Sequence, residues 1–509
     1  LAVSAPAASA GSSSAGAGLR RAAVSNLGFA GLWKGLSWVL NWGVAVVLAR
    51  VLSREDFGLF AIASVLTGFF ARFSEMGIAA AVVQRQRDDS ATLETAFTLR
   101  LGALLASGAL LAALAPLWAA FYRQPLVAPL IWAILVPTVA AGLFFVPSVR
   151  LYRDYRHGRT RFAQFAGEAA KGGGILLAAI YGAGVWSFVV GTVAGSLATW
   201  ACYAAFSPWR PRLRFDREVA RELFAFGRFV LAADLLFFLT GNVANALLGR
   251  LLGVAAVGDY RQAYVYGSWA VAEVAQLLSE TLYPAFARRQ DNPVARRTGW
   301  RATLRATGAI VFPLTLGLAA VAPDFVRAVL NPAGDPGKWD GAIVPLQILC
   351  LFGLVLSFER VSHPVIFSAG RPHAVTVGQA AMLVVLLGGL LIGVPAFGLP
   401  GAAAASVLAA LVATAIVLRA AAGIAGVSAR EILLDLSGPF ASAVAMAGLV
   451  LLAGSLLGPG PGPLGRLAAR VGLGVVAYLL AGRLFMPGTQ REILGEVSVL
   501  LRRPASTRR

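Results

Sequence analysis

Charged side chains inside long apolar stretches are the residues of this chain that could do chemistry. A charge at the centre of a bilayer span costs about 2.5–3.5 kcal/mol on insertion scales, so each one suggests a substrate, an ion or a pairing partner. Ammonium and guanidinium groups suit phosphate, whereas intramembrane carboxylates suit ion coupling. The candidate substrate-binding cations are Lys34, Arg72, Lys171 and Arg360, and the candidate ion-coupling acids are Asp234, Glu273 and Glu359.

Lysine is rare in this chain, and two of its three lysines fall within predicted spans. These are Lys34 and Lys171, whereas Lys338 lies in a gap. Lys171 stands about nine residues into its span, at a depth of about 13 Å. It either faces the substrate or pairs with Glu168 three residues earlier, and both alternatives stay open. For Lys34, near the end of its span, snorkelling to the headgroups is slightly favoured.

The other candidates lie in clusters that local pairing also explains. Arg72 and Glu75 are three residues apart in the second span, and Glu359, Arg360 and His363 cluster in the tenth. A lone histidine is favoured here as a hydrogen-bonded packing residue rather than a proton relay. Two polar stripes belong on a water-filled cavity or a partner helix. They are Asp234, Asn242 and Asn245 in the seventh span, and Glu273, Gln276 and Glu280 in the eighth.

The pattern of residues argues against an enzyme, a cofactor protein or a nucleic-acid binder. Cys202 and Cys350 lie inside apolar runs and suggest neither a disulfide framework nor a metal site. The sequence lacks a GxxxxGK[ST] loop, so direct ATP drive is not expected. The net charge of +20 comes from basic residues in short gaps between apolar runs, not from a basic soluble domain. We expect no catalytic residues, metal, cofactor or nucleic-acid partner.

The elements that carry the candidate residues are predicted membrane-spanning helices. The chain is 58% hydrophobic and 13% charged, whereas soluble proteins carry about 25% charged residues. Apolar runs recur at about the 20 residues that cross a bilayer. The predicted fold class is an all-α polytopic membrane protein of about fourteen helices. The predicted spans are 28–49, 57–81, 96–121, 126–149, 162–181, 184–206, 222–248, 257–285, 302–322, 342–368, 374–394, 399–421, 438–457 and 465–486.

A polar turn after the first span has a second copy in the chain. Residues 48–60 read LARVLSREDFGLF and residues 248–260 read LGRLLGVAAVGDY, with identities at four positions that are 200 residues apart. Six helices separate the copies, so the halves are predicted to be parallel repeats about a pseudo-two-fold axis along the membrane normal. In the first turn, Ser53 and Asp56 have capping-box spacing, which predicts the start of a helix.

The repeat and the composition divide the chain into predicted parts. Two six-helix lobes are followed by two further helices, and an Ala/Ser/Gly-rich start is either a disordered tail or a remnant of cloning. The parts are a tail at 1–20, an N-lobe at 21–206, a basic cytoplasmic linker at 207–221, a C-lobe at 222–421, helices thirteen and fourteen at 422–486, and a basic cytoplasmic tail at 487–509.

The distribution of basic residues predicts the orientation in the membrane. Gaps after even-numbered spans hold 20 Lys and Arg residues when Arg419 at the end of the twelfth span is counted with them, and gaps after odd-numbered spans hold 6. Positive residues stay on the cytoplasmic side. We therefore expect a multi-pass protein of the bacterial cytoplasmic membrane with both termini in the cytoplasm, and the turn at 48–60 on the outer side.

The two turns and the segments between them resemble a known family. LARVLSREDFGLFAIA with SEMGIAAAVVQR, then GAGVWSFVVGTVAGS, WRPRLRFD, FGRFV and LLGRLLGVAAVGDYRQAY, occur in the order seen in polysaccharide transporters. These are the Wzx-type lipid-linked oligosaccharide flippases of the multidrug/oligosaccharidyl-lipid/polysaccharide exporter superfamily. The resemblance covers about residues 30–420. One departure is Asn245, near a place where the family often has an acidic residue.

The resemblance implies a flippase that works by alternating access. Its substrate would be an undecaprenyl-pyrophosphate-linked oligosaccharide used in polysaccharide biosynthesis, and its partners would be membrane lipids, this substrate and other polysaccharide assembly proteins. A drug or cation exporter of the same superfamily is the alternative that the acidic candidates keep open. A membrane-embedded glycan polymerase or ligase is disfavoured because the predicted outward gaps are short.

The predicted orientation can be tested by thiol labelling. In a variant whose two native cysteines are replaced, Arg159→Cys and Arg212→Cys each place one thiol in a predicted cytoplasmic gap. We expect neither to react with a membrane-impermeant maleimide in intact cells, and both to react after permeabilisation. Labelling of either thiol from outside would contradict the topology.

Overall fold

The computed structural model is helical throughout the part of the chain that it describes. This part comprises residues 35–85, 90–142, 144–153, 157–207, 212–269, 271, 275, 292–456 and 462–486, and it contains no strand. The predicted all-α polytopic fold class is confirmed. The predicted tails at 1–20 and 487–509 lie outside the described residues.

The predicted spans coincide with helices. Within the described ranges, nine helices are long and apolar enough to cross a membrane, or ten if one bent pair is a single span. One of the nine, α14 (His373–Ala425), holds two predicted spans. Two further spans fall on the shorter helix Gly35–Val51 and on α7 (His157–Ile180). The span predicted at 257–285 begins in α10 (Val254–Tyr264), and most of it from residue 270 on lies outside the described residues. The arrangement is thus consistent with about fourteen spans.

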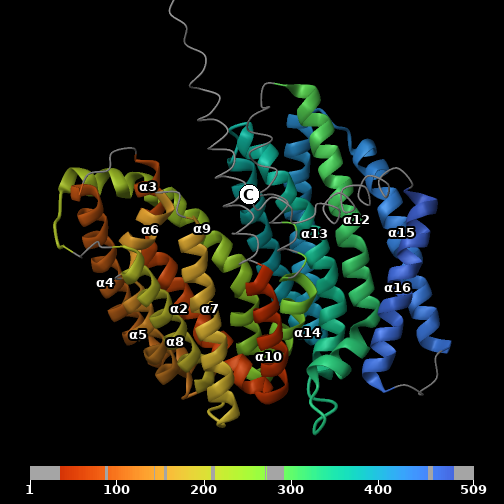
Figure 1. The fold of residues 1–509 in the computed structure, drawn as a ribbon, viewed down its shortest axis with the longest axis horizontal. Helices are drawn as coiled ribbons and strands as arrows, with labels where there is room; N and C mark the ends of the chain where they lie inside the picture. The colour runs from red at the N-terminus through yellow and green to blue at the C-terminus, as the bar shows by residue number, and fades with distance from the viewer. Residues whose placement is uncertain are drawn as a thin grey trace, which may run out of the picture. The chain divides into compact units, whose positions relative to one another are not determined.

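The chain forms two compact units, which Figure 1 shows in a single view. The first comprises residues 1–52 and 66–234, and the second comprises residues 53–65 and 235–509. Two helices contribute to both units, namely α2 (Arg54–Glu75) and α9 (Arg217–Leu251). The limits proposed above for lobes, linker and tails stay predictions.

The first unit is built from a series of helices around an apolar core. Besides parts of α2 and α9 it holds helix Gly35–Val51, α3 (Ile78–Gln84), α4 (Ser90–Tyr122), α5 (Val127–Gly142), α6 (Phe145–Arg153), α7 and α8 (Trp186–Phe206). Buried side chains of α3, α4 and α6 meet those of α9, among them Val82, Phe97, Val146 and Leu223.

The second unit contains the C-terminal helices. Besides α10 and α14, it holds the π-helix η1 (Val265–Trp269), α12 (Pro293–Phe325), the π-helix η2 (Val326–Leu330), the 3-10 helix η3 (Asp340–Ala342), α13 (Ile343–Ser368), α15 (Ala429–Leu456) and α16 (Pro463–Phe485). Its largest apolar cluster joins α12, α13, α14 and α15 through residues such as Leu304, Val365, Val417 and Ala443.

Two interruptions within apolar runs follow local backbone rules. The gap predicted after residue 394 is confirmed, because α14 kinks at Gly398, which has a φ of 62° and lies between Pro395 and Pro400. The span predicted at 126–149 as one helix is instead broken into α5 and α6, which are bent by 50°. Pro147 in the first turn of α6 lacks an N–H, so this position suits a helix start better than a helix interior.

The two repeated turns pack against each other through glycine. A Cβ atom added at Gly58 of α2 would overlap the backbone carbonyl of Val254, and one added at Gly258 of α10 would overlap that of Arg54. The contact is reciprocal: Gly58 meets residue 254, and Gly258 meets residue 54. Positions 54 and 254, like 58 and 258, are equivalent in the two repeats because they are 200 residues apart. Both segments belong to the second unit. This is the pairing that two equivalent helices crossing at a two-fold axis require.

Polar groups complete the junction between the turns. The predicted capping box is confirmed: the Ser53 hydroxyl accepts from the Asp56 N–H at 3.0 Å, and the Asp56 carboxylate accepts from the Ser53 N–H at 2.9 Å. Arg54 forms an ion pair of 3.0 Å with Asp259 of the second turn. Phe57 packs edge-on against the fully buried Trp339, with ring centroids 5.5 Å apart. The charges of the first turn therefore cap a helix and join the two repeats.

An ion network fixes α15 to α12. Arg301 makes a bidentate contact with Asp435, at 2.6 and 3.0 Å, and a further bond of 2.8 Å to Glu431. Arg297 also reaches Glu431 at 2.7 Å. Planar guanidinium groups hold carboxylates in this geometry with more specificity than an ammonium would. The network explains two arginines of the predicted cytoplasmic gap as structural residues.

The glycine contact between the turns predicts the effect of adding one methyl group. We expect Gly58→Ala or Gly258→Ala to destabilise the purified protein by about 1–3 kcal/mol, because backbone must move to admit the Cβ. Gly241→Ala on α9 is the matched control, since nothing lies within 4 Å of its Cβ position. The control should be neutral or stabilising by up to about 1 kcal/mol. Equal melting temperatures for Gly58→Ala and the control would refute the close packing.

Candidate functional site: a polar cavity in the first unit

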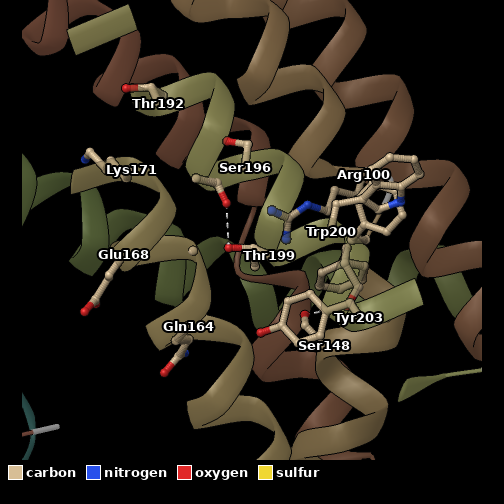
Figure 2. Close-up of a pocket in the computed structure, with 14 residues that line it drawn as sticks. Arg100, Ser148, Gln164, Glu168, Lys171, Thr192, Ser196, Thr199, Trp200 and Tyr203 are labelled. Atoms are coloured by element: carbon tan, nitrogen blue, oxygen red, sulfur yellow. Dashed lines mark hydrogen bonds between the residues drawn. The ribbon is translucent and has the colours of Figure 1, made fainter. Parts of the chain in front are cut away.

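A polar cavity of about 470 Å³ lies within the first unit, between α4, α6, α7 and α8 (Figure 2). Aromatic rings and small residues form much of its wall, and charged, amide and hydroxyl groups line the rest. The polar and aromatic residues labelled in the view are Arg100, Ser148, Gln164, Glu168, Lys171, Thr192, Ser196, Thr199, Trp200 and Tyr203.

Glycine residues bring the two helices that build most of this site into close contact. A Cβ at Gly191 of α8 would lie 2.6 Å from the carbonyl oxygen of Lys171, and one at Gly195 would lie 2.8 Å from that of Gly167. On α7, a Cβ at Gly174 would meet the backbone of Gly191 at 3.1 Å. Small residues spaced four apart let helices approach closely inside a membrane. The sequence GTVAGS of α8 therefore positions the Lys171 turn of α7.

Two cations reach the cavity from different helices. Lys171 of α7 is exposed, and Arg100 of α4 has a side chain that is 16% exposed. In Figure 2 they lie on either side of Ser196 and Thr199. Arg100 is 3.6 Å from the Glu75 carboxylate and lies over the Phe145 ring at 4.5 Å. Its buried Nε has no hydrogen-bond partner among the described residues, so a donor stays available for an anionic group.

The pairing of Lys171 with Glu168, left open above, stays an alternative, and Glu168 also has a second partner. Glu168 accepts a hydrogen bond from the Asn41 side chain at 3.4 Å. In Figure 2 the Lys171 and Glu168 side chains extend from successive turns of α7, and their charged ends lie apart. The Glu168 carboxylate thus contacts helix Gly35–Val51, and both Glu168 and Lys171 are among the residues that line the cavity.

Hydroxyl and aromatic groups give the cavity the character of a sugar site. Thr192, Thr199 and Ser148 each donate their hydroxyl proton to a carbonyl of their own helix, at 2.7 to 2.9 Å. Their oxygen lone pairs are thus left to accept hydrogen bonds. Trp200 and Tyr203 add aromatic surface with polar edges, suited to ligands with an apolar and a polar side. Together with the cations, these groups can bind a hydroxyl-rich anion.

The other predicted site residues do not line this cavity. Arg72 is exposed on α2, Asp234 is half-buried on α9, and Glu359 and Arg360 lie on α13 in the second unit. The predicted pair of Arg72 with Glu75 has a competitor in Arg100, which contacts Glu75. Lys34 and Glu273 lie outside the described residues. Among those described, no group of three or more His, Cys, Asp or Glu residues could hold a metal ion.

Sequence reasoning missed Arg100, although a signal for it existed. Arg100 lies within the predicted span 96–121, so the criterion that selected Lys171 applies to it equally. Its partner Phe145 is 45 residues away in the sequence and belongs to a helix break that the hydropathy pattern did not show. Arg100 lines the cavity because α4 packs against α6. That packing belongs to the tertiary structure and cannot be read from the sequence pattern.

The fold defines the class of protein, a multi-pass helical membrane protein with transporter architecture. The structure titled "Lipid II flippase MurJ, inward closed conformation" is 12% identical with a TM-score of 0.73, covering 91% of this chain and 99% of that chain. An inward-facing multidrug resistance MATE family transporter of the MOP superfamily is 16% identical with a TM-score of 0.60, covering 77% and 95%. At such identities the likeness establishes the fold alone.

The sequence assigns the family within this class. The model of the family described as "Polysaccharide biosynthesis protein" matches residues 47–337, and the chain belongs to that family. It is 25% identical over 346 residues to the lipopolysaccharide biosynthesis protein WzxC of Escherichia coli (strain K12), covering 65% of this chain and 67% of that protein. The succinoglycan biosynthesis transport protein ExoT of Rhizobium meliloti (strain 1021) is 25% identical over 362 residues, covering 70% of each.

A third relative extends this likeness. The teichuronic acid biosynthesis protein TuaB of Bacillus subtilis (strain 168) is 23% identical over 301 residues, covering 58% of this chain and 61% of that protein. The predicted membership among polysaccharide transporters is confirmed. The chain is a multi-pass membrane protein of a transport family in polysaccharide biosynthesis.

The glycine contact between α7 and α8 predicts a second packing effect. We expect Gly195→Ala to destabilise the protein by about 1–3 kcal/mol and to displace Lys171, because its Cβ would lie 2.8 Å from both the Gly167 carbonyl and the Lys171 Cβ. Gly173→Ala on α7 is the control, because its Cβ position has no atom within 4 Å. Denaturant unfolding in detergent measures both. A Gly195→Ala variant as stable as Gly173→Ala would show that the helices are not in close contact.

Proposed function

We propose that this protein translocates a lipid-linked oligosaccharide across the cytoplasmic membrane by alternating access, for polysaccharide biosynthesis. The observation that carries the proposal is the cavity of the first unit, in which Arg100 and Lys171 stand beside hydroxyl groups and the aromatic residues Trp200 and Tyr203. A sugar chain on an undecaprenyl pyrophosphate offers hydroxyl groups and negative charge together. The family and its named relatives support the same substrate class.

The charge of the cavity favours this substrate over a cationic drug. Among the described residues, its lining includes two cations and one acid, Glu168, whose carboxylate accepts from Asn41. Guanidinium and ammonium groups make charge-assisted hydrogen bonds to phosphate oxygens, and each would repel a cationic ligand. A drug or cation exporter of the same fold would need more acidic than basic side chains in the lining of its cavity.

The proposal extends to orientation and partners. Both chain ends would lie in the cytoplasm, because the basic gaps follow the even-numbered spans. The lobes at 21–206 and 222–421 would alternate around the substrate, with the linker at 207–221 on the cytoplasmic side. Membrane lipids and other polysaccharide assembly proteins would be the partners in the cell.

Removal of the cavity cations tests the proposed substrate contact. We expect Lys171→Ala or Arg100→Ala to lower translocation of the lipid-linked oligosaccharide at least about tenfold, since a charge-assisted hydrogen bond contributes roughly 1.5–3 kcal/mol. The readout is complementation of surface polysaccharide in a strain that lacks this protein. Arg228→Ala is the control, an exposed cation of the same unit that lies over Phe229 outside the cavity lining. It should retain normal translocation.

A double variant separates substrate binding from a structural ion pair. If Lys171 only balances Glu168, the single variant should lose stability, and Glu168→Ala combined with Lys171→Ala should restore both stability and translocation. If Lys171 binds the substrate, the double variant stays inactive. Restored translocation in the double variant would therefore remove Lys171 from the substrate site.

A further inference from the structure

A buried acid in the second unit takes no part in the cavity of the first. Glu359 lies in the interior of α13 and is 1% exposed. An ionised carboxylate in an apolar, membrane-spanning environment is costly unless it is paired or neutralised by a proton. The groups around Glu359 therefore decide which charge state the fold can hold.

One carboxylate oxygen of Glu359 has two nitrogen neighbours. Its Oε1 accepts a hydrogen bond from Nε2 of Gln379 on α14 at 3.0 Å, and it lies 3.4 Å from Nε2 of His363, one turn further along α13. The Glu359 side chain is 2% exposed, whereas that of His363 is 16% exposed. The three side chains thus connect a fully enclosed acid to an imidazole with partial access to the surroundings.

Much of the neighbourhood of Glu359 that the structure describes is apolar. Its sequence neighbour Phe358 and the nearby Val361 belong to the buried cluster that α13 forms with α12 and α14. On the next turn, Ser362 accepts a hydrogen bond from the indole of Trp300 at 3.3 Å. A net charge at Glu359 would therefore face a medium with little power to stabilise it.

Charged and titratable groups on the helices packed against α13 have contacts of their own. Arg301 and Arg305 of α12 face Asp435. On α10, Asp259 pairs with Arg54, Arg261 lies over Phe60 and the Tyr264 ring packs on Phe352. Tyr266 of η1 packs on Phe325, and Asp340 of η3 contacts Arg327. On α14, His373 lies in the first turn and Arg419 near the C-terminal end. Among the residues that the structure describes, His363 is thus the titratable group within hydrogen-bond distance of Glu359.

We propose that Glu359, His363 and Gln379 form a proton-binding site that couples transport to the proton gradient. With one proton bound, the pair is neutral overall, either as a carboxylic acid beside a neutral imidazole or as a carboxylate beside an imidazolium. Loss of that proton leaves one negative charge in the apolar cluster. The uncharged amide of Gln379 donates to the carboxylate oxygen in either state and holds it in position.

The site links proton release to the packing of α13 on α14. Separation of these helices would break the Gln379 bond and admit water, which solvates the carboxylate and lets the proton leave through the imidazole. Renewed packing would require a proton to be taken up again. A cycle of this kind supplies the differential binding between two states that ion-driven alternating access needs. Its physiological meaning rests on the transport function proposed above, whereas proton binding itself does not.

Infrared difference spectroscopy of the full-length protein in lipid nanodiscs tests the site without substrate. Spectra taken between about pH 5 and pH 8, the range in which histidine normally titrates, should contain carboxyl and imidazole bands from this pair. We expect Glu359→Gln to remove the carboxyl contribution and to change the imidazole contribution, because the imidazole remains but loses its carboxylate neighbour. We expect His363→Gln to remove the imidazole contribution. Glu222→Gln is the control, because Glu222 is a 58% exposed acid paired with Arg85 in the first unit, and it should leave these bands unchanged.

Each outcome decides the proposal. Spectra of Glu359→Gln or His363→Gln that match the wild type over the whole pH range would overturn it, and either variant alone suffices if the other fails to fold. Replacement of sodium by choline supplies a further arm: a sodium-dependent band that Glu359→Gln abolishes would mean a sodium site instead. If Lys171→Ala translocates normally while the pH-dependent bands persist, the substrate proposal fails and the proton site stands.

Discussion

Close backbone contact at glycine is the constraint on which the rest of this structure depends. Inside a bilayer, lipid is as apolar as the helices, so packing must come from surfaces that approach closely. Gly58 and Gly258 allow α2 and α10 to touch backbone to backbone, and Gly191 and Gly195 do the same for α8 against α7. The first contact joins the two repeats, and the second shapes the cavity. A methyl group at any of these four positions would separate the helices.

The arginine side chains of the closely packed helices have different roles. Arg54 with Asp259 joins the two turns, and Arg301 with Asp435 holds α15 on α12. These pairs neutralise charge where the fold needs it. Arg100 lines a polar cavity instead, and its Nε lacks a hydrogen-bond partner among the described residues. All three are arginines, so the distinction between structural and functional charge depends on what each guanidinium contacts.

Proteins with this helix arrangement differ in the substrates that they carry. A lipid II flippase and a multidrug transporter share this architecture at 12% and 16% identity, so the helix arrangement can serve chemically unlike substrates. The substrate would then be selected by the lining of the cavity. In this protein that lining combines cations, hydroxyls and aromatic rings, while a separate acid and imidazole in the second unit form the proton site proposed above. The proposed substrate and proton sites thus occupy different units of one chain.

The sequence by itself determined the features that depend on neighbours along the chain. Hydropathy located the spans, the spacing of Ser53 and Asp56 located a helix start, the offset of 200 residues revealed the repeat, and rare lysine usage pointed to Lys171. Only the tertiary structure decided which distant residues meet, such as Arg54 with Asp259, 205 residues apart, or Arg100 with Lys171 around one cavity. The physical reason is range: hydrogen bonding within a helix and partition into lipid are local. Contacts between helices instead depend on the summed packing of whole surfaces, and a run of apolar residues does not specify its partner.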